Sequence, residues 1–403
     1  MILAHKIRLD PTPRQEDYFR RACGTARFTY NWALSAWKAS YDAGDKPSGR
    51  SLKKQFNAVR SVEYPWTRKV HRDCTARPFD NLQNAFQHFF RRVKAGEKPG
   101  YPQFKKKGKC KDGFYIACDK VQFSSRHVRV PVLGWVKMRE PLRFAGKVLG
   151  VTVSRTADRW DIAVQVDVGE VHKNRSADGV VGVDLGIKTS GTLSTGEKIE
   201  GPKALRTNLK KLKWLSRRHS RKVKGSSGRK KSAMRLARLH ARIANVRKDY
   251  LDKLSTLLCK NHAAIGIEDL YVQGMVLNRK LSRAISDEGW GQFRWMLSYK
   301  SLLYGTKIVV ADRWFPSSKT CSDCCHVVEK LPLGIREWAC PVCGVVHDRD
   351  VNAAKNLEPD NVPGGTGELT LVEIAALANP YGSVKLRSSK PESSSRSPQT
   401  VAV

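Results

Sequence analysis

The apolar and polar positions of the first residues follow two different periods. Residues 3–9 place mostly apolar side chains at alternate positions and charged ones between them, which predicts a strand that Pro11 ends. Thr12 and Gln15 then match the capping box that opens a helix, and the apolar positions after them recur every three or four residues. Gly24 is a residue type that commonly ends a helix, so we expect this helix to stop there.

A helical period continues over residues 26–94, with recurring aromatic positions and a break around Pro65 and Pro78. The following segment, 94–111, holds too much Gly, Pro and Lys for a packed element, so it should be a basic connector. We therefore predict a helical domain with a basic connector at residues 25–110.

Three later stretches have the composition of strands. They are residues 128–131, 148–155 and 160–168, and the last two flank a polar turn. These strands predict a compact β-barrel or sheet at residues 111–175. Residues 1–24 would supply its first strand and leading helix, which would make the helical domain an insertion in the barrel.

A basic stretch follows the polar break at 174–178 and the apolar strand at 180–183. Residues 206–248 carry seventeen Lys and Arg and no Asp or Glu, on two predicted helices separated by the turn at 225–228. A solvated face is the simpler interpretation, but without acidic neighbours the charges would repel one another, so phosphate contact is favoured. The candidate nucleic-acid-binding residues, including three from the connector, are Lys105, Lys106, Lys107, Lys210, Lys211, Arg217, Arg218, Lys222, Arg229, Lys230 and Lys231.

The overall charge supports a polyanionic partner. The 403 residues include 74 Lys and Arg against 37 Asp and Glu, a formal net charge of +37, which exceeds what solubility requires. The chain is long enough for two or three domains, and it has no apolar run of membrane-spanning length and no secretory signal. Charge alone would equally fit a ribosomal or chromatin protein, so it indicates nucleic-acid binding and leaves the chemistry open.

Four cysteines have the spacing of a zinc ribbon. Cys321 and Cys324 form one C-x2-C pair, and fifteen residues later Cys340 and Cys343 form a second. Four thiolates leave no open coordination position, so we expect one structural Zn2+ and reduced thiols. Cys325 directly follows the first pair, and we interpret it as a bystander.

Acidic residues stand at the ends of two apolar stretches and near the start of a predicted helix. Asp184 ends the first apolar stretch and Glu268 the second, while Asp348 and Asp350 lie in the helix start beyond the ribbon. Taken singly, each could be a cap or turn residue. Together they could bind Mg2+, and two such ions about 4 Å apart can assist phosphodiester hydrolysis.

The order of motifs along almost the whole chain resembles one family. The segments KIRLDPTPRQ, GTARFTYNWAL, NAFQHFFRRVK, GYPQFKKK, GVDLGIK, IGIEDL, SDEGWGQF, FPSSKTCSDC, CPVCG and HDRDVNAAKNL occur in this order. They resemble the TnpB, or OrfB, proteins of bacterial and archaeal insertion sequences, which are related to the type V CRISPR effector nucleases.

The resemblance implies an α+β multidomain protein. It would contain a RuvC-type, ribonuclease-H-like α/β domain at residues 176–380 with an inserted zinc ribbon at about 315–346, preceded by a wedge β-barrel that carries a helical recognition domain. Residues 381–403 would form a disordered tail.

The resemblance also implies the site residues. Asp184, Glu268 and Asp350 would be the catalytic acids and would hold Mg2+, with Asp348 competing for the third place. Asp269 should point away from Glu268 and be structural. The family usually has Gly where this chain has Cys325, which leaves the choice of zinc ligands open at that position.

The implied activity is RNA-guided cleavage of DNA. An RNA from the transposon end would guide the protein to complementary double-stranded DNA beside a short adjacent motif, and Mg2+-assisted hydrolysis would produce a double-strand break. The alternatives are a transposase that joins DNA ends and a nuclease-dead, guided DNA-binding regulator. The expected compartment is the cytoplasm, with no membrane partner.

Overall fold

The computed structural model describes residues 1–169, 178–332 and 334–362. The chain divides into two compact units, Met1–His172 with Lys211–Arg242 and Lys173–Lys210 with Ile243–Val403. The expected tail at 381–403 and most of the expected polar break at 174–178 lie outside the described residues.

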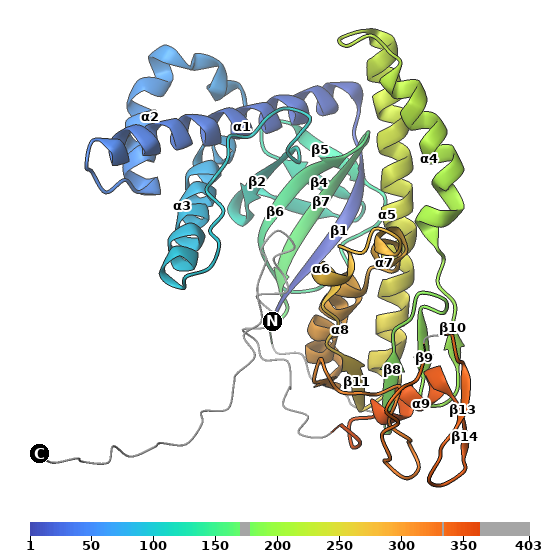
Figure 1. Cartoon of the computed structure of the whole chain (residues 1–403). Helices are drawn as coiled ribbons and strands as arrows, with labels where there is room; N and C mark the ends of the chain where they lie inside the picture. Colours follow the sequence, from blue (N-terminus) through green and yellow to red (C-terminus); the bar gives the residue numbers. More distant parts are fainter. Residues whose placement is uncertain (170–177, 333, 363–403) are drawn as a thin grey trace, which may run out of the picture. The chain divides into compact units, whose positions relative to one another are not determined.

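A seven-stranded sheet forms the centre of the first unit (Figure 1). Its strand order is β2-β6-β7-β1-β5-β4-β3, so the first strand of the chain lies in the middle of the sheet, and three helices precede β2 in sequence. Phe19 and Trp160 pack at its core with ring centroids 5.1 Å apart. The strands are β1 (Ile2–Asp10), β2 (Gly113–Ala117), β3 (Gln122–Ser124), β4 (His127–Val130), β5 (Gly134–Met138), β6 (Lys147–Thr156) and β7 (Arg159–Asp167).

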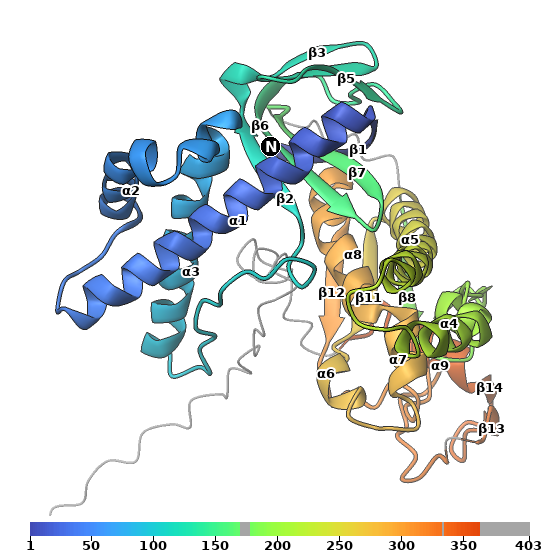
Figure 2. The ribbon, with the colours of Figure 1, turned by 90° about the horizontal axis from the view of Figure 1, so that it is seen from above.

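Helices α2 (Gly49–Glu63) and α3 (Asp73–Lys94) both contact α1 (Pro13–Asp42), as Figure 2 shows. The capping box at Thr12 and Gln15 is present. The expected helix end at Gly24 is wrong, because the buried stripe of α1 continues beyond it and its packing outweighs the roughly 1 kcal/mol that glycine costs in a helix. The expected break at Pro65 is present, because the 3-10 turn Pro65–Lys69 separates α2 from α3, but the expected break at Pro78 is wrong, since this proline lies inside α3.

The second unit contains a five-stranded mixed sheet with the order β10-β9-β8-β11-β12. Strands β8, β11 and β12 are parallel, and β9 and β10 complete one edge in antiparallel pairs. The strands are β8 (Val180–Asp184), β9 (Gly191–Leu193), β10 (Lys198–Ile199), β11 (Ala264–Glu268) and β12 (Lys307–Ala311).

Helices cover the central strands β8 and β11 on both faces. Side chains of α5 (Ser227–Asn261) and α8 (Trp290–Tyr304) pack with Val181, Val183, Ile265 and Ile267, while α9 (Arg349–Asn356) contacts β8 and β9. The remaining elements are α4 (Ala204–Ser220), α6 (Val272–Met275), α7 (Ser282–Glu288) and the hairpin of β13 (Glu337–Ala339) and β14 (Val346–Asp348). In the described part of the chain, no helix combines the length and the apolar character needed to cross a membrane.

Candidate active site and metal centres

Two of the three candidate acids end neighbouring parallel strands. Asp184 is the last residue of β8 and Glu268 is the last residue of β11, and the ladder pairs Gly182 with Gly266. Because side chains alternate along a strand, each acid shares a face with the glycine two residues before it. The adjacent apolar residues point to the opposite face, where α5 and α8 pack.

Those two glycines let α9 lie directly on the sheet. A Cβ atom on Gly182 would lie 1.8 Å from the carbonyl oxygen of Ala354, and one on Gly266 would lie 1.6 Å from that of Leu357. Any side chain at either position would therefore displace the end of α9. This close approach holds the helix that carries Asp350 against the strands that carry the other two acids.

The two candidates for the third acid have different local roles. Asp348 is the N-cap of α9, because its Oδ1 atom accepts hydrogen bonds from the amides of Asp350 and Val351. Burial would raise the pKa of Asp348, but hydrogen bonds from Lys198 and from the Val351 amide lower it. Asp350 lies in the first turn of the helix, with its Oδ1 atom 3.0 Å from Nη1 of Arg336.

The electrostatics of Asp184 place all three acids in one neighbourhood. Burial, and after it the nearby carboxylates of Glu268 and Asp350, raise the pKa of Asp184 to about 8, against the opposing influence of Arg349 and Arg336. An acid in this environment resists ionisation unless a cation compensates its charge. The donor set of three hard oxygens therefore fits Mg2+.

Glu268 is held by a residue that the sequence analysis did not identify. The Ser317 hydroxyl donates a hydrogen bond to Glu268 Oε1 over 2.7 Å. Burial raises the pKa of Glu268, and the Ser317 hydrogen bond opposes that rise. Ser317 belongs to the FPSSKTC segment, and only the fold brings it to Glu268, 49 positions away in sequence.

Two asparagines of α9 fix the loop that contains Ser317. The Asn356 side chain donates to the Ser317 carbonyl over 2.8 Å, and the Asn352 side chain donates to the Thr320 carbonyl over 2.7 Å. Both asparagines are almost completely buried. One helix therefore carries Asp350 and also positions the loop that contacts Glu268.

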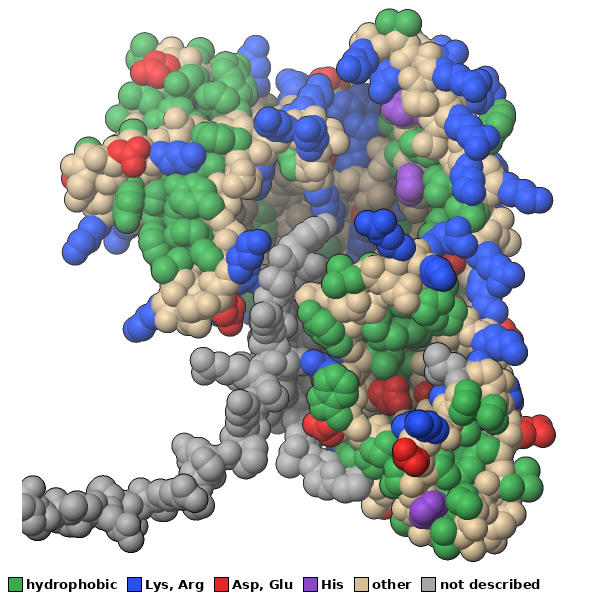
Figure 3. Space-filling model, in the orientation of Figure 1, with side chains coloured by type: hydrophobic (Ala, Val, Ile, Leu, Met, Phe, Trp, Pro, Cys, Tyr) green, Lys and Arg blue, Asp and Glu red, His purple; other side chains and the backbone are tan. Residues whose placement is uncertain are grey.

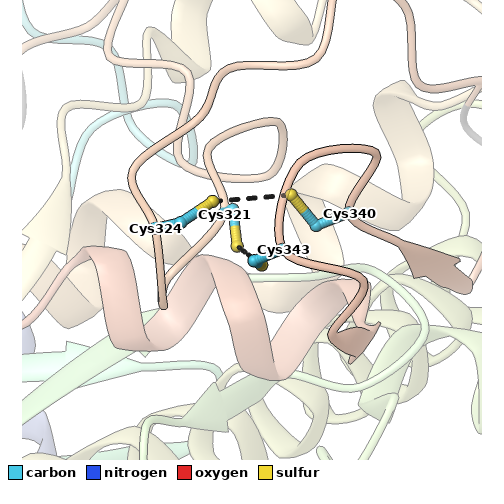
Figure 4. A group of neighbouring side chains, drawn as sticks. All are labelled: Cys321, Cys324, Cys340 and Cys343. Atoms are coloured by element: carbon cyan, nitrogen blue, oxygen red, sulfur yellow. Dashed lines mark hydrogen bonds between the residues drawn. The ribbon is translucent and has the colours of Figure 1, made fainter.

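The four predicted zinc cysteines, Cys321, Cys324, Cys340 and Cys343, lie together in the segment that precedes α9 (Figure 4). Their sulfur atoms all lie within 4.8 Å of one another, with Cys321 and Cys343 3.6 Å apart and Cys324 and Cys340 3.5 Å apart. Sulfurs around one tetrahedral Zn2+ with bonds near 2.3 Å would be about 3.8 Å apart, so the group fits zinc. Amide hydrogen bonds, first from Cys343, lower the pKa of Cys340 to about 6 and favour its thiolate.

Two further residues flank the four-cysteine group. Cys325 lies outside it and has a φ of 61°, the left-handed conformation that favours glycine. His347 is buried, with Nε2 3.1 Å from the sulfur of Cys321. Among the residues that the structure describes, the carboxylate oxygens of Asp184, Glu268 and Asp350 do not all lie within 4.8 Å of one another, so the three acids are more widely spaced than the cysteines.

Most of the candidate basic residues are exposed, and Lys and Arg side chains gather over α4 in Figure 3. Lys105 departs from the expectation, because its ammonium lies 3.8 Å from the centre of the Tyr30 ring and burial lowers its pKa. Arg229 also has an internal role, since its Nη1 atom donates to the carbonyls of His219 and Lys222. These two residues stabilise the fold, and the other nine keep exposed charges: Lys106, Lys107, Lys210, Lys211, Arg217, Arg218, Lys222, Lys230 and Lys231.

Family models match three stretches of the chain. A helix-turn-helix domain of the OrfB IS605 type matches residues 1–46, a stretch that forms β1 and α1 in the structure. A model described as "Probable transposase", OrfB of the IS605 type, matches residues 163–279, and the "Cas12f1-like, TNB domain" matches residues 290–357.

Whole-chain relatives carry consistent names. A Streptomyces pristinaespiralis protein named "Putative RNA-guided DNA endonuclease" is 37% identical over 364 residues, which cover 88% of each chain. InsQ of Escherichia coli strain K12, with the same description, is 32% identical over 375 residues, which cover 88% of this chain and 91% of InsQ. In fold, the chain is similar to the protein of a Cas12f1–sgRNA–target DNA complex, with a TM-score of 0.51 at 14% identity over 86% of this chain and 83% of that one.

Proposed function

The chain belongs to the IS605 OrfB family, also called TnpB, and from this premise we propose that it is an RNA-guided DNA endonuclease. Its product would be a double-strand break in DNA that is complementary to the guide and lies next to a short motif. The observation that carries the proposal is the convergence of Asp184, Glu268 and Asp350 from β8, β11 and α9.

The three acids would hold Mg2+. Bound Mg2+ would supply activation of the attacking water and charge neutralisation at the leaving oxygen. Asp184, whose pKa is raised by both of the other carboxylates, would be one of the ligands. Ser317 would keep one Glu268 oxygen in a fixed orientation, while Arg336 holds Asp350 at the entrance to α9.

The zinc ribbon would act as a scaffold. Four cysteine ligands leave no position for substrate, so a zinc ion there would contribute folding free energy without taking part in the chemistry. Asn352 also accepts a hydrogen bond from the amide of Ser322, inside the first C-x2-C pair. The knuckle is thereby joined to the helix of Asp350.

The charge of the chain suits two nucleic-acid partners, a guide RNA and a target DNA duplex. Backbone phosphates dominate such binding, and sequence would be selected by base pairing between guide and target. Replacing Lys210, Lys211, Lys222, Lys230 and Lys231 by Gln should weaken RNA binding and flatten its dependence on salt concentration. An unchanged salt slope would mean that these lysines do not contact phosphate.

The decisive experiment begins with the RNA that copurifies when the protein is expressed beside its native flanking DNA. A plasmid that matches the variable end of that RNA is then incubated with the complex and Mg2+. We expect one discrete RNA and guide-dependent cutting that Asp184→Ala abolishes while binding persists. Binding without any cutting by the wild type would instead support a DNA-binding regulator.

The family description "Probable transposase" favours a second candidate, a transposase that joins DNA ends. The same carboxylates could serve strand transfer, because hydrolysis and transfer differ in the attacking oxygen and share the metal site. Incubating the complex with labelled transposon ends and a target plasmid separates the two activities, since only a transposase would yield joined products.

A further inference from the structure

An aromatic and cationic surface lies where strands β11 and β12 end. It consists of Tyr271, Arg313 and Trp314, which we call the mouth cluster. Trp314 is 85% exposed, and Tyr271 is 50% exposed. Burying a large aromatic side chain is favourable, so a tryptophan as exposed as Trp314 is typical of a surface that binds a partner.

The mouth cluster is held in place by ion pairs. Asp269, the residue after Glu268, pairs with Arg313 through one carboxylate oxygen and with Arg294 through the other. These pairs lower the pKa of Asp269 although burial opposes them. The Arg313 guanidinium in turn lies 5.2 Å from the centre of the Tyr271 ring.

Local backbone contacts turn Trp314 outward. The Trp314 amide donates to Asp312 Oδ1 over 2.8 Å, and the next amide, that of Phe315, donates to the Asp312 carbonyl over 3.1 Å. Phe315 packs against the buried residues Val309 and Leu357. The turn therefore partly buries the Phe315 ring and leaves its neighbour Trp314 exposed.

Two segments of the mouth cluster are close in sequence to residues of the carboxylate site. Tyr271 lies three residues after Glu268, and Trp314 lies three residues before Ser317, whose hydroxyl contacts Glu268. Both loops leave the same ends of parallel strands, and Asp269 bridges them through Arg313. A chain bound on the cluster would lie beside the reacting carboxylates.

We propose that the mouth cluster binds unpaired bases of the DNA strand that is cut, with Trp314 stacking on one base. This inference rests on the proposed nuclease function. A π-face accepts any base, so the contact adds affinity without adding sequence preference. Only a single strand presents its base faces, so the cluster would favour a strand already separated from its complement and would position its backbone at the acids.

The binding test uses two twelve-nucleotide probes of identical charge, oligothymidylate and an abasic strand of the same length. The probes are titrated at high salt into the RNA-bound protein carrying Asp184→Ala, which removes cleavage. We expect a preference for the base-bearing strand that Trp314→Ala lowers on the order of tenfold. Trp314→Phe should retain most of the preference for the base-bearing strand. The matched control is Trp66→Ala, because Trp66 is a tryptophan of the other unit that is 42% exposed.

The cleavage test uses the copurified RNA, a matching duplex and single abasic substitutions along the cut strand. In the wild type, an abasic site at one position of the cut strand should slow cutting about tenfold. Trp314→Ala should slow cutting of the intact duplex by the same factor, and the abasic site should not slow that variant further. A preference unchanged by Trp314→Ala, or equally reduced by Trp66→Ala, would overturn the proposal. So would a stronger response to oligouridylate than to oligothymidylate, which would assign the cluster to RNA.

The two proposals fail in different ways. If the wild-type complex does not cut a matching plasmid at all, the nuclease function fails, whatever the probes show. If it cuts normally and Trp314→Ala cuts at the same rate, only the role of the mouth cluster fails. Because Trp314 is exposed, its replacement should leave the unfolding midpoint unchanged, which separates a binding defect from misfolding.

Discussion

Replacing Asp184 by Asn should stabilise the fold at alkaline pH in a solution without Mg2+. The pKa of Asp184 rises from 3.8 to about 8, first through burial and then through Glu268 and Asp350. The folded chain thus binds this proton more tightly than the unfolded chain, so stability falls as pH rises from about 4 to about 8. A tenfold change in proton affinity equals about 1.4 kcal/mol, so the loss of folding stability caused by ionising Asp184 is at most about 6 kcal/mol.

Relaxation around the ionised group should reduce this cost to roughly half of the ceiling, about 3 kcal/mol. Asn has nearly the same volume and cannot ionise, so it avoids the cost. We therefore expect Asp184→Asn to be about 3 kcal/mol more stable than the wild type at pH 9 and close to it at pH 4.5. Mg2+ should stabilise the wild type at pH 9, because a ligand that binds the folded state raises its stability. The variant should be unaffected, because it lacks the Asp184 carboxylate.

The assay is urea unfolding at both pH values, in zinc-containing buffer without chelator so that the ribbon stays intact. Asp348→Asn is the matched control: the pKa of this carboxyl is lowered, so removing its charge should give no gain at pH 9. An Asp184→Asn gain of equal size at both pH values would refute the reasoning, since it would not come from ionisation. A wild type indifferent to Mg2+ would also contradict the assigned metal site.

Three further predictions follow from the same geometry. Asp350→Asn should lower the single-turnover cleavage rate by roughly 10³-fold or more, whereas Asp348→Asn should keep it within about tenfold, because Asn is an equally good helix cap; equal losses would reverse the assignment. Cys340→Ser should remove the single zinc measured by mass spectrometry and lower the urea midpoint, and an unchanged midpoint would show that the ribbon is dispensable. Cys325→Gly should raise stability by about 0.5 kcal/mol at constant zinc content by relieving the left-handed backbone, which calorimetry can check.

Local patterns in the sequence were sufficient for the elements that carry the acids. The apolar runs before Asp184 and Glu268 predicted the buried strands β8 and β11, and the cysteine spacing predicted the four-sulfur group. The choice between Asp348 and Asp350 was harder, because the sequence marks both as residues near a helix start. In the structure, Asp348 accepts the amide hydrogen bonds of an N-cap, which favours the proposal of Asp350 as the third acid.

Contacts between distant segments were beyond the reach of those patterns. Gly24 has the residue type of a helix end, and only the packing of α1 beyond it shows that the helix continues. Lys105 belongs to a basic run, but its position over Tyr30 depends on the path of the connector around α1. Ser317 and Arg336 reach the acids from loops whose positions depend on α9 and the ribbon.

The contact between α9 and the two glycines has an evolutionary consequence. A gene copy can keep its acidic residues and still lose the packing that positions them. In this protein a change from Gly182 or Gly266 to Ala would force a Cβ atom into the backbone of α9 or the residue that follows it. Such a copy would retain every acid and every zinc ligand and still be inert, so a survey of living copies should score these two glycines together with the acids.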